Sequence, residues 1–177
     1  MSRFMLDCAS SRPVDADVAQ WLGMAATRAW APVTGGYHEA KISQALLHQA
    51  AATVAGATGG TSAWFTADPP TAVAHAVLDV LTRRAYEVVV TGQADAIVLQ
   101  QSSVNAAAQA GVAHTVVGVD SRGRLLDLPD RAVVVTGAVN QEIGTVQPDF
   151  GGWAAASGSA VVLDATSLQR SLGLLAQ

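Results

Sequence analysis

Apolar runs of strand length alternate along this chain with longer segments whose apolar residues recur at helical spacing. The pattern predicts one helix that begins at Asp15 and is broken at Pro32, and further helices over residues 38–54, 69–84, 104–110 and 149–156. It predicts strands at residues 4–8, 62–66, 88–90, 96–99, 114–119, 132–136 and 160–164. Strands that alternate with helices in this way indicate an α/β fold with a mostly parallel sheet.

Local signals support the start of two of these helices. Asp15 precedes an apolar face that includes Trp21 and Leu22, and an acidic residue at this position caps free backbone N–H groups. The third helix begins near Pro69 and Pro70, and proline is tolerated in a first helical turn.

Composition limits the classes of protein to consider. The 177 residues are half hydrophobic and only 14% charged, which favours one globular domain over residues 1–177. A net charge of −4 gives no reason to expect nucleic acid or a membrane surface as a partner. The N-terminus lacks the apolar stretch of a signal peptide, and Cys8 is the single cysteine, so a cytoplasmic protein without a disulfide is expected.

The chain has one lysine, Lys41, because nine of its ten basic residues are arginine. It lies within the second predicted helix, where a solvated side chain is the simplest interpretation. A mechanism that requires a lysine amine would have to use Lys41 or a residue of another chain. The four histidines show no metal-ligand spacing, so no metal site is expected.

The most specific motif is Asn140-Gln141-Glu142-Ile143-Gly144-Thr145-Val146-Gln147-Pro148, which follows the predicted strand at 132–136. A second motif, Asp164-Ala165-Thr166, completes the predicted strand at 160–164 and continues beyond it. Ligands of open α/β sheets bind at the carboxyl ends of the strands. The two motifs therefore indicate a binding site at that edge.

Together with weaker pieces at 5–14, 62–66 and 119–125, these motifs resemble the cysteine desulfurases, and the likeness extends over nearly the whole chain. These are class V aminotransferase-type enzymes that use pyridoxal phosphate (PLP). The resemblance implies a three-layer α/β fold, part of the large domain of fold type I PLP-dependent transferases, truncated within that domain. It implies PLP-dependent sulfur release from L-cysteine as the ancestral activity.

The resemblance also implies a PLP site of four residues. Asp164 takes the place of the carboxylate that keeps the pyridine nitrogen protonated, so that the ring can act as an electron sink. Gln141 replaces an Asn that bonds the cofactor's phenolic oxygen, and Ser167 replaces a Gln of the family pattern. Thr71 would offer a hydroxyl to the phosphate. None of the four is expected to be a catalytic residue.

Several positions depart from the family pattern. The turn that should hold the PLP phosphate contains Pro69 and Pro70, which lack N–H donors, and Asp68, which is negatively charged and better suited to cap a helix. Residues 101–105, interpreted as the turn that carries the family's stacking His, contain no aromatic side chain. The family's Schiff-base lysine and persulfide cysteine lie further along than this sequence extends, and Cys8 is interpreted as a small buried thiol.

Three alternatives to an active desulfurase remain open. In the first, the chain is a fragment of a longer enzyme and is inactive without the rest. In the second, it is a non-catalytic pseudoenzyme that binds a partner or acts as a scaffold. A remote alternative is a short-chain dehydrogenase, because Gly137 and Gly144 form a glycine-rich turn and Tyr37 precedes Lys41 by four positions. In that class the glycine turn comes first in the chain, the reverse of the order found here.

The resemblance places strands from beyond residue 177 between the 62–66 segment and the rest of the sheet. Without them the sheet would have open apolar edges, which favour aggregation or pairing with other chains. A homodimer, or association with another polypeptide that completes the sheet, is therefore expected.

Overall fold

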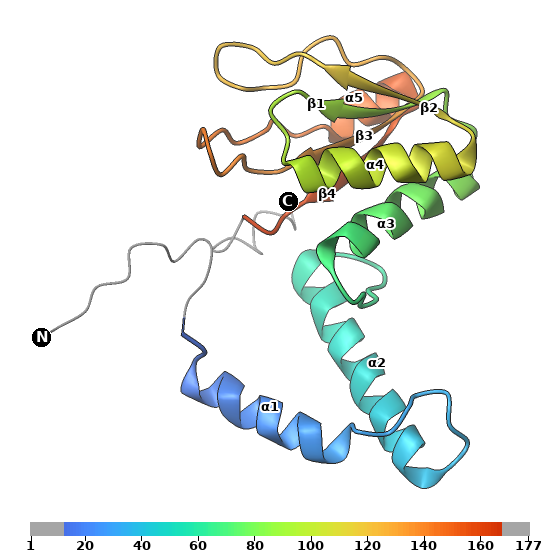
Figure 1. Cartoon of the computed structure of the whole chain (residues 1–177), viewed down its shortest axis with the longest axis vertical. Helices are drawn as coiled ribbons and strands as arrows, with labels where there is room; N and C mark the ends of the chain where they lie inside the picture. Colours follow the sequence, from blue (N-terminus) through green and yellow to red (C-terminus); the bar gives the residue numbers. More distant parts are fainter. Residues whose placement is uncertain (1–12, 168–177) are drawn as a thin grey trace, which may run out of the picture. The chain divides into compact units, whose positions relative to one another are not determined.

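The computed structural model describes residues 13–167, which belong to two compact units. The first unit contributes residues 13–65 and the second residues 66–167 (Figure 1). The strand expected at 4–8 and the role expected for Cys8 lie outside the described residues.

The first unit holds two helices, α1 (Ala16–Arg28) and α2 (His38–Thr58). As predicted, Asp15 caps α1, since its Oδ1 accepts a hydrogen bond of 3.1 Å from the N–H of Asp17. Helix α2 continues beyond residue 54 and stops at Gly59, whose φ of 68° is a conformation that glycine adopts without strain. The apolar face of α1 is exposed, with Trp21 69% accessible.

The strand predicted at residues 62–66 does not form. No other strand of the described chain pairs with this segment, and Trp64 and Phe65 are exposed. A strand exists only where its N–H and C=O groups pair with a neighbour, so the β-propensity of these residues is insufficient by itself.

The second unit is built around four parallel strands, which confirms the predicted α/β class. The strands are β1 (Val88–Gly92), β2 (Ala113–Val117), β3 (Ala132–Gly137) and β4 (Ala160–Asp164), in the spatial order β2-β1-β3-β4. The helices are α3 (Pro69–Arg83), α4 (Ile97–Ala110) and α5 (Gly151–Ser157).

Helices cover both faces of the sheet, so the unit has the three layers expected (Figure 1). Alternate residues of a strand point to opposite faces, and the valines of β1 and β3 therefore supply two cores. The core beneath α3 and α4 consists of Val77, Val89, Ala106, Ala107, Val133 and Val135. The core on the α5 face consists of Val90, Ala132 and Val134, against which Leu125 and Trp153 pack.

Residues 96–99, predicted as a strand, instead lead into and form the first turn of α4, and the short helix predicted at 104–110 is the second half of α4. A short apolar run suits a strand and a buried helical turn equally well. The parallel strands β1 and β2 need a crossover connection, and α4 provides it. The strand-to-helix turn therefore lies at residues 93–96, and the earlier assignment of 101–105 to this turn is wrong.

Candidate functional site

Asp95 joins the carboxyl ends of two neighbouring strands. Its Oδ2 accepts a hydrogen bond of 2.7 Å from the N–H of Gly92, at the end of β1. Its Oδ1 accepts bonds from the Thr136 hydroxyl at 2.8 Å and the Gly137 N–H at 3.1 Å, both at the end of β3. A half-buried carboxylate with three donors fixes the turn at 93–96 to this edge of the sheet. Asp95 was not among the residues predicted from sequence, because residues 96–99 were predicted as a strand and the turn before α4 was therefore not recognised.

Asn140 shapes the loop that follows β3. Its Oδ1 accepts hydrogen bonds from the N–H groups of Glu142 and Ile143 at 2.9 and 3.2 Å, which closes a tight turn. Its Nδ2 donates to the carbonyl oxygen of Ala94 at 2.5 Å. The first residue of the most specific motif therefore builds the loop and connects it to the turn after β1.

The end of the same motif binds the segment at 119–125. The Gln147 side chain donates to the Gly123 carbonyl at 3.0 Å and accepts from the Leu125 N–H at 3.3 Å. The Thr145 hydroxyl donates to the carbonyl of Arg122. Two sequence motifs that are far apart in the chain are thus parts of one hydrogen-bonded structure.

Three of the four predicted PLP residues lie at the carboxyl ends of β3 and β4. The Gln141 Nε2 donates a hydrogen bond of 2.6 Å to the Ser167 hydroxyl. Asp164 ends β4, its carbonyl accepts the N–H of Ala138 at 2.8 Å, and its Oδ1 accepts the N–H of Thr166 at 2.9 Å. This edge combines a half-buried carboxylate with an amide and a hydroxyl that bond each other.

Thr71, the fourth predicted residue, lies in the first turn of α3. This helix ends just before β1 begins, so its N-terminus points toward the carboxyl edge of the sheet. Asp68 caps the helix as expected, with its Oδ1 accepting the Thr71 N–H at 2.7 Å. This bond, and to a lesser degree the Thr71 hydroxyl, lower the pKa of Asp68 below its ordinary value of 3.8. Among residues 13–167, no hydrogen bond joins Thr71 to the other three predicted residues.

The start of α3 does not fit a phosphate dianion. A helix N-terminus binds phosphate through free N–H groups. Here Pro69 and Pro70 have no N–H, the N–H of Thr71 is bonded to Asp68, and the lowered pKa keeps that carboxylate charged at neutral pH. Asp164 and Gln141 have the side chains that a pyridine ring would need, but the phosphate end of PLP has neither donors nor a favourable charge.

Other elements of a PLP enzyme are missing from this unit. The turn at 93–96 contains no aromatic side chain that could stack on a ring. Residues 66–167 contain no lysine, and Lys41 is exposed on α2 of the first unit.

No group of three possible metal ligands occurs among residues 13–167. In the same part of the chain, no helix is both long and apolar enough to cross a membrane.

No protein-family model matches the sequence, and no curated protein matches it either. Solved structures do resemble it. DndA from Streptomyces lividans superposes with a TM-score of 0.72 at 19% identity, over 98% of this chain and 52% of its own. SspA, in complex with cysteine, gives 0.72 at 19% identity, over 90% of this chain and 49% of its own. The apo cysteine desulfurase of Thermococcus onnurineus NA1 gives 0.69 at 16% identity, over 90% of this chain and 43% of its own.

These neighbours confirm the expected resemblance to cysteine desulfurases at the level of the fold, which is that of PLP-dependent fold type I. This chain spans about half the length of the structures that it resembles.

Proposed function

We propose that this chain is a cysteine desulfurase-like protein that does not release sulfur from L-cysteine by itself and acts through association with a second polypeptide. The observation that carries the proposal is the closed N-terminus of α3. Asp68, Pro69 and Pro70 occupy the place where the phosphate of PLP would bind and leave it without a donor. The absence of lysine from residues 66–167 supports the same conclusion.

Comparison of PLP with pyridoxal, which lacks the phosphate, tests the cofactor part of this proposal. Both compounds are added to the full chain, absorbance is recorded, and borohydride reduction with mass spectrometry locates any adduct. Because the phosphate has no binding place, equal and weak responses to the two compounds are expected. Lys41→Arg serves as the control, since it removes the only lysine amine.

A gain-of-function variant makes this comparison stricter. Asp68→Ser combined with Pro69→Gly and Pro70→Ala restores two N–H donors and removes the negative charge. This variant should bind PLP more tightly than pyridoxal, while the natural chain should not. The proposal is wrong if the natural chain prefers PLP by about tenfold or more, or if it releases sulfide from L-cysteine after PLP is added.

Association with a partner is proposed because strand β4 lies at an open edge of the described sheet. Strand β4 pairs with β3 on one side, and among residues 13–167 no strand pairs with its other side. Leu163, an apolar residue of this edge strand, is 41% exposed. Exposed apolar edges recruit further strands. A second copy of the chain, or a polypeptide that supplies the missing strands, would complete the sheet in this proposal.

Light scattering of the purified chain tests this association. A dimer, or a complex with a copurifying chain, is expected for the natural sequence. Leu163→Lys should weaken it, because a lysine on an edge strand opposes pairing. Val104→Lys on helix α4, an apolar residue of similar exposure that does not lie on an edge strand, is the matched control and should leave the mass unchanged. A stable monodisperse monomer of the natural chain would refute the association.

A further inference from the structure

A concave site lies near the amino-terminal ends of the strands, away from the candidate site at their carboxyl ends. It is a hollow of about 550 Å³ lined by Arg84, Ala85, Arg131, Ala156, Ser157 and Gly158. Three segments meet there: the end of α3, the residue before β3 and the end of α5. None of these residues belongs to the candidate site at the carboxyl edge.

The backbone of Arg131 is held in an unfavourable conformation at this hollow. Its φ of 53° lies in the left-handed region, which residues with a Cβ rarely adopt. Its N–H donates to the Ser157 carbonyl at 3.0 Å, and its own carbonyl accepts the N–H of Glu87 at 2.9 Å. The bonds on both sides fix the direction in which the side chain leaves the backbone. Strain of this kind is concentrated at functional sites in proteins.

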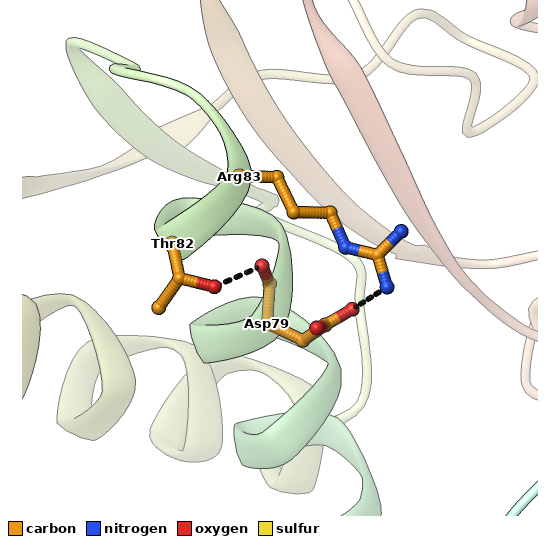
Figure 2. Close-up of polar contacts among 3 residues, drawn as sticks. All are labelled: Asp79, Thr82 and Arg83. Atoms are coloured by element: carbon orange, nitrogen blue, oxygen red, sulfur yellow. Dashed lines mark hydrogen bonds and ion pairs between the residues drawn. The ribbon is translucent and has the colours of Figure 1, made fainter.

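Arg84 lies over Gly158 on the other side of the hollow. Its Nη1 is 3.9 Å from the position that a Cβ on Gly158 would take. Within residues 13–167 Arg84 forms no ion pair. Arg83 differs, because its Nη2 is 2.6 Å from Asp79 Oδ2, and Figure 2 shows its guanidinium turned to that carboxylate. Of two adjacent arginines, one pairs with an acidic residue along α3 and the other lines the hollow.

The hollow carries more positive than negative charge. Arg131 Nη1 is 3.3 Å from Glu87 Oε1, but both side chains are more than half exposed, so this ion pair is weak. The residues that line the hollow include two arginines and no acidic residue, and Glu87 is paired, within residues 13–167, with Arg131 alone. Guanidinium remains charged throughout the accessible pH range, and its forked N–H donors match the oxygens of a phosphate.

We propose that this hollow binds a doubly charged oxyanion, either phosphate or the phosphate group of a small ester, between Arg84 and Arg131. The proposal is independent of the proposed function, because it involves the other edge of the sheet. The competing explanation is that both arginines only balance the partial negative charge at the C-termini of α3 and α5. That role requires no ligand, so it predicts no saturable binding.

An NMR titration of the full chain with sodium phosphate tests the proposal, with sodium chloride at equal ionic strength as the reference. Saturable shifts are expected at the amides of Arg131, Ser157 and Gly158. Arg84→Gln should weaken phosphate binding about tenfold, the effect of losing a charge-assisted hydrogen bond. Arg131→Asn should do the same, and asparagine is chosen because it tolerates positive φ. Arg83→Gln is the matched control and should bind phosphate as the natural chain does.

Two further arms complete the experiment. Glu87→Gln should tighten phosphate binding, because it removes the carboxylate that pairs with Arg131. Glycerol phosphate should give shifts at the same amides, and tighter binding than inorganic phosphate would identify an organic ester as the ligand. Equal affinity would identify the phosphate group alone as sufficient. The proposal is overturned if shifts do not saturate, or if Arg84→Gln lowers thermal stability and leaves phosphate affinity unchanged.

Discussion

Asp95, in the turn after β1, accepts a hydrogen bond of 2.8 Å from the hydroxyl of Thr136, which is fully buried near the end of β3. The same carboxylate accepts the N–H groups of Gly92 and Gly137. One side chain therefore aligns the ends of both central strands. The loop that carries Gln141 begins directly after β3, so its position depends on this contact.

Replacement of Asp95 by alanine should destabilise the second unit. The loss of one acceptor leaves three donors without a partner, and we expect the free energy of unfolding to fall by roughly 2–4 kcal/mol. Urea unfolding measures the change. Glu142→Gln is the control, since this exposed side chain accepts no hydrogen bond within residues 13–167 and should alter stability by less than about 0.5 kcal/mol. Equal effects of the two substitutions would contradict the role given to Asp95.

Asp68 should make stability depend on pH in the acidic range. Its pKa in the folded protein is lowered below 3.8, chiefly by the bond from the Thr71 N–H. A carboxyl group of this kind stabilises the fold above its unfolded pKa, and the contribution is lost as the pH falls through the folded pKa. Asp68→Ala should therefore lower the melting temperature at neutral pH, and the difference from the natural chain should vanish in acid.

Asp68→Asn separates the cap from the charge. Asparagine also caps helices but does not titrate, so this variant should keep much of the stability at neutral pH and lose the acidic dependence. A difference between Asp68→Ala and the natural chain that persists unchanged into acid would contradict this account.

The fold was predictable to the extent that local pattern determines it. The alternation of strand-like runs with helical segments indicated a parallel sheet, and the valine runs of β1 and β3 are buried on both faces as such a sheet requires. The pattern failed where pairing decides the structure. Residues 62–66 have strand-like composition, but no strand within residues 13–167 pairs with them. Residues 96–99 are an apolar run that the crossover requires to be helical.

The candidate site was predicted less completely. The motifs at 140–148 and 119–125 were noted separately, but their hydrogen bonds through Gln147 join residues more than twenty positions apart, which spacing alone does not show. The misfit of phosphate at Asp68 and Pro69 was visible in the sequence, because proline lacks an N–H in any fold. Asp95 was missed since its role arises only when β1 and β3 lie side by side.

Protonation of His114 should destabilise the fold as the pH falls below neutral. Its Nε2 lies 3.1 Å from the Thr91 hydroxyl, and burial lowers the pKa of His114 below 6.5. The unfolded chain takes up the proton first, so stability is complete above pH 6.5 and falls as the pH drops through the folded pKa. The melting temperature of the natural chain should therefore fall more steeply in this range than that of His114→Asn.

NMR titration of the His114 ring gives the direct measurement. The midpoint should lie below 6.5. A midpoint at or above this value would show that burial does not control the protonation of this side chain.

Gly123 and Gly144 should respond differently to the same substitution, although their φ angles are similar, at 75° and 70°. A Cβ on Gly123 would overlap Ile143 Cδ1 and lie 2.7 Å from Thr145 Oγ1, whereas a Cβ on Gly144 meets nothing within 4 Å. Gly144→Ala therefore carries only the cost of the left-handed backbone, about 1 kcal/mol.

Gly123→Ala carries that cost and must also move the side chains of Ile143 and the buried Thr145, for a total of roughly 2–4 kcal/mol. Urea unfolding of the two variants measures the difference, and the NMR shifts of the Gln147 side-chain amide, which donates to the Gly123 carbonyl, should move only in Gly123→Ala. Equal destabilisation, with those shifts unchanged, would mean that the loop is not packed on Gly123. The two motifs would then be independent of each other, and the geometry of the candidate site would not depend on their contact.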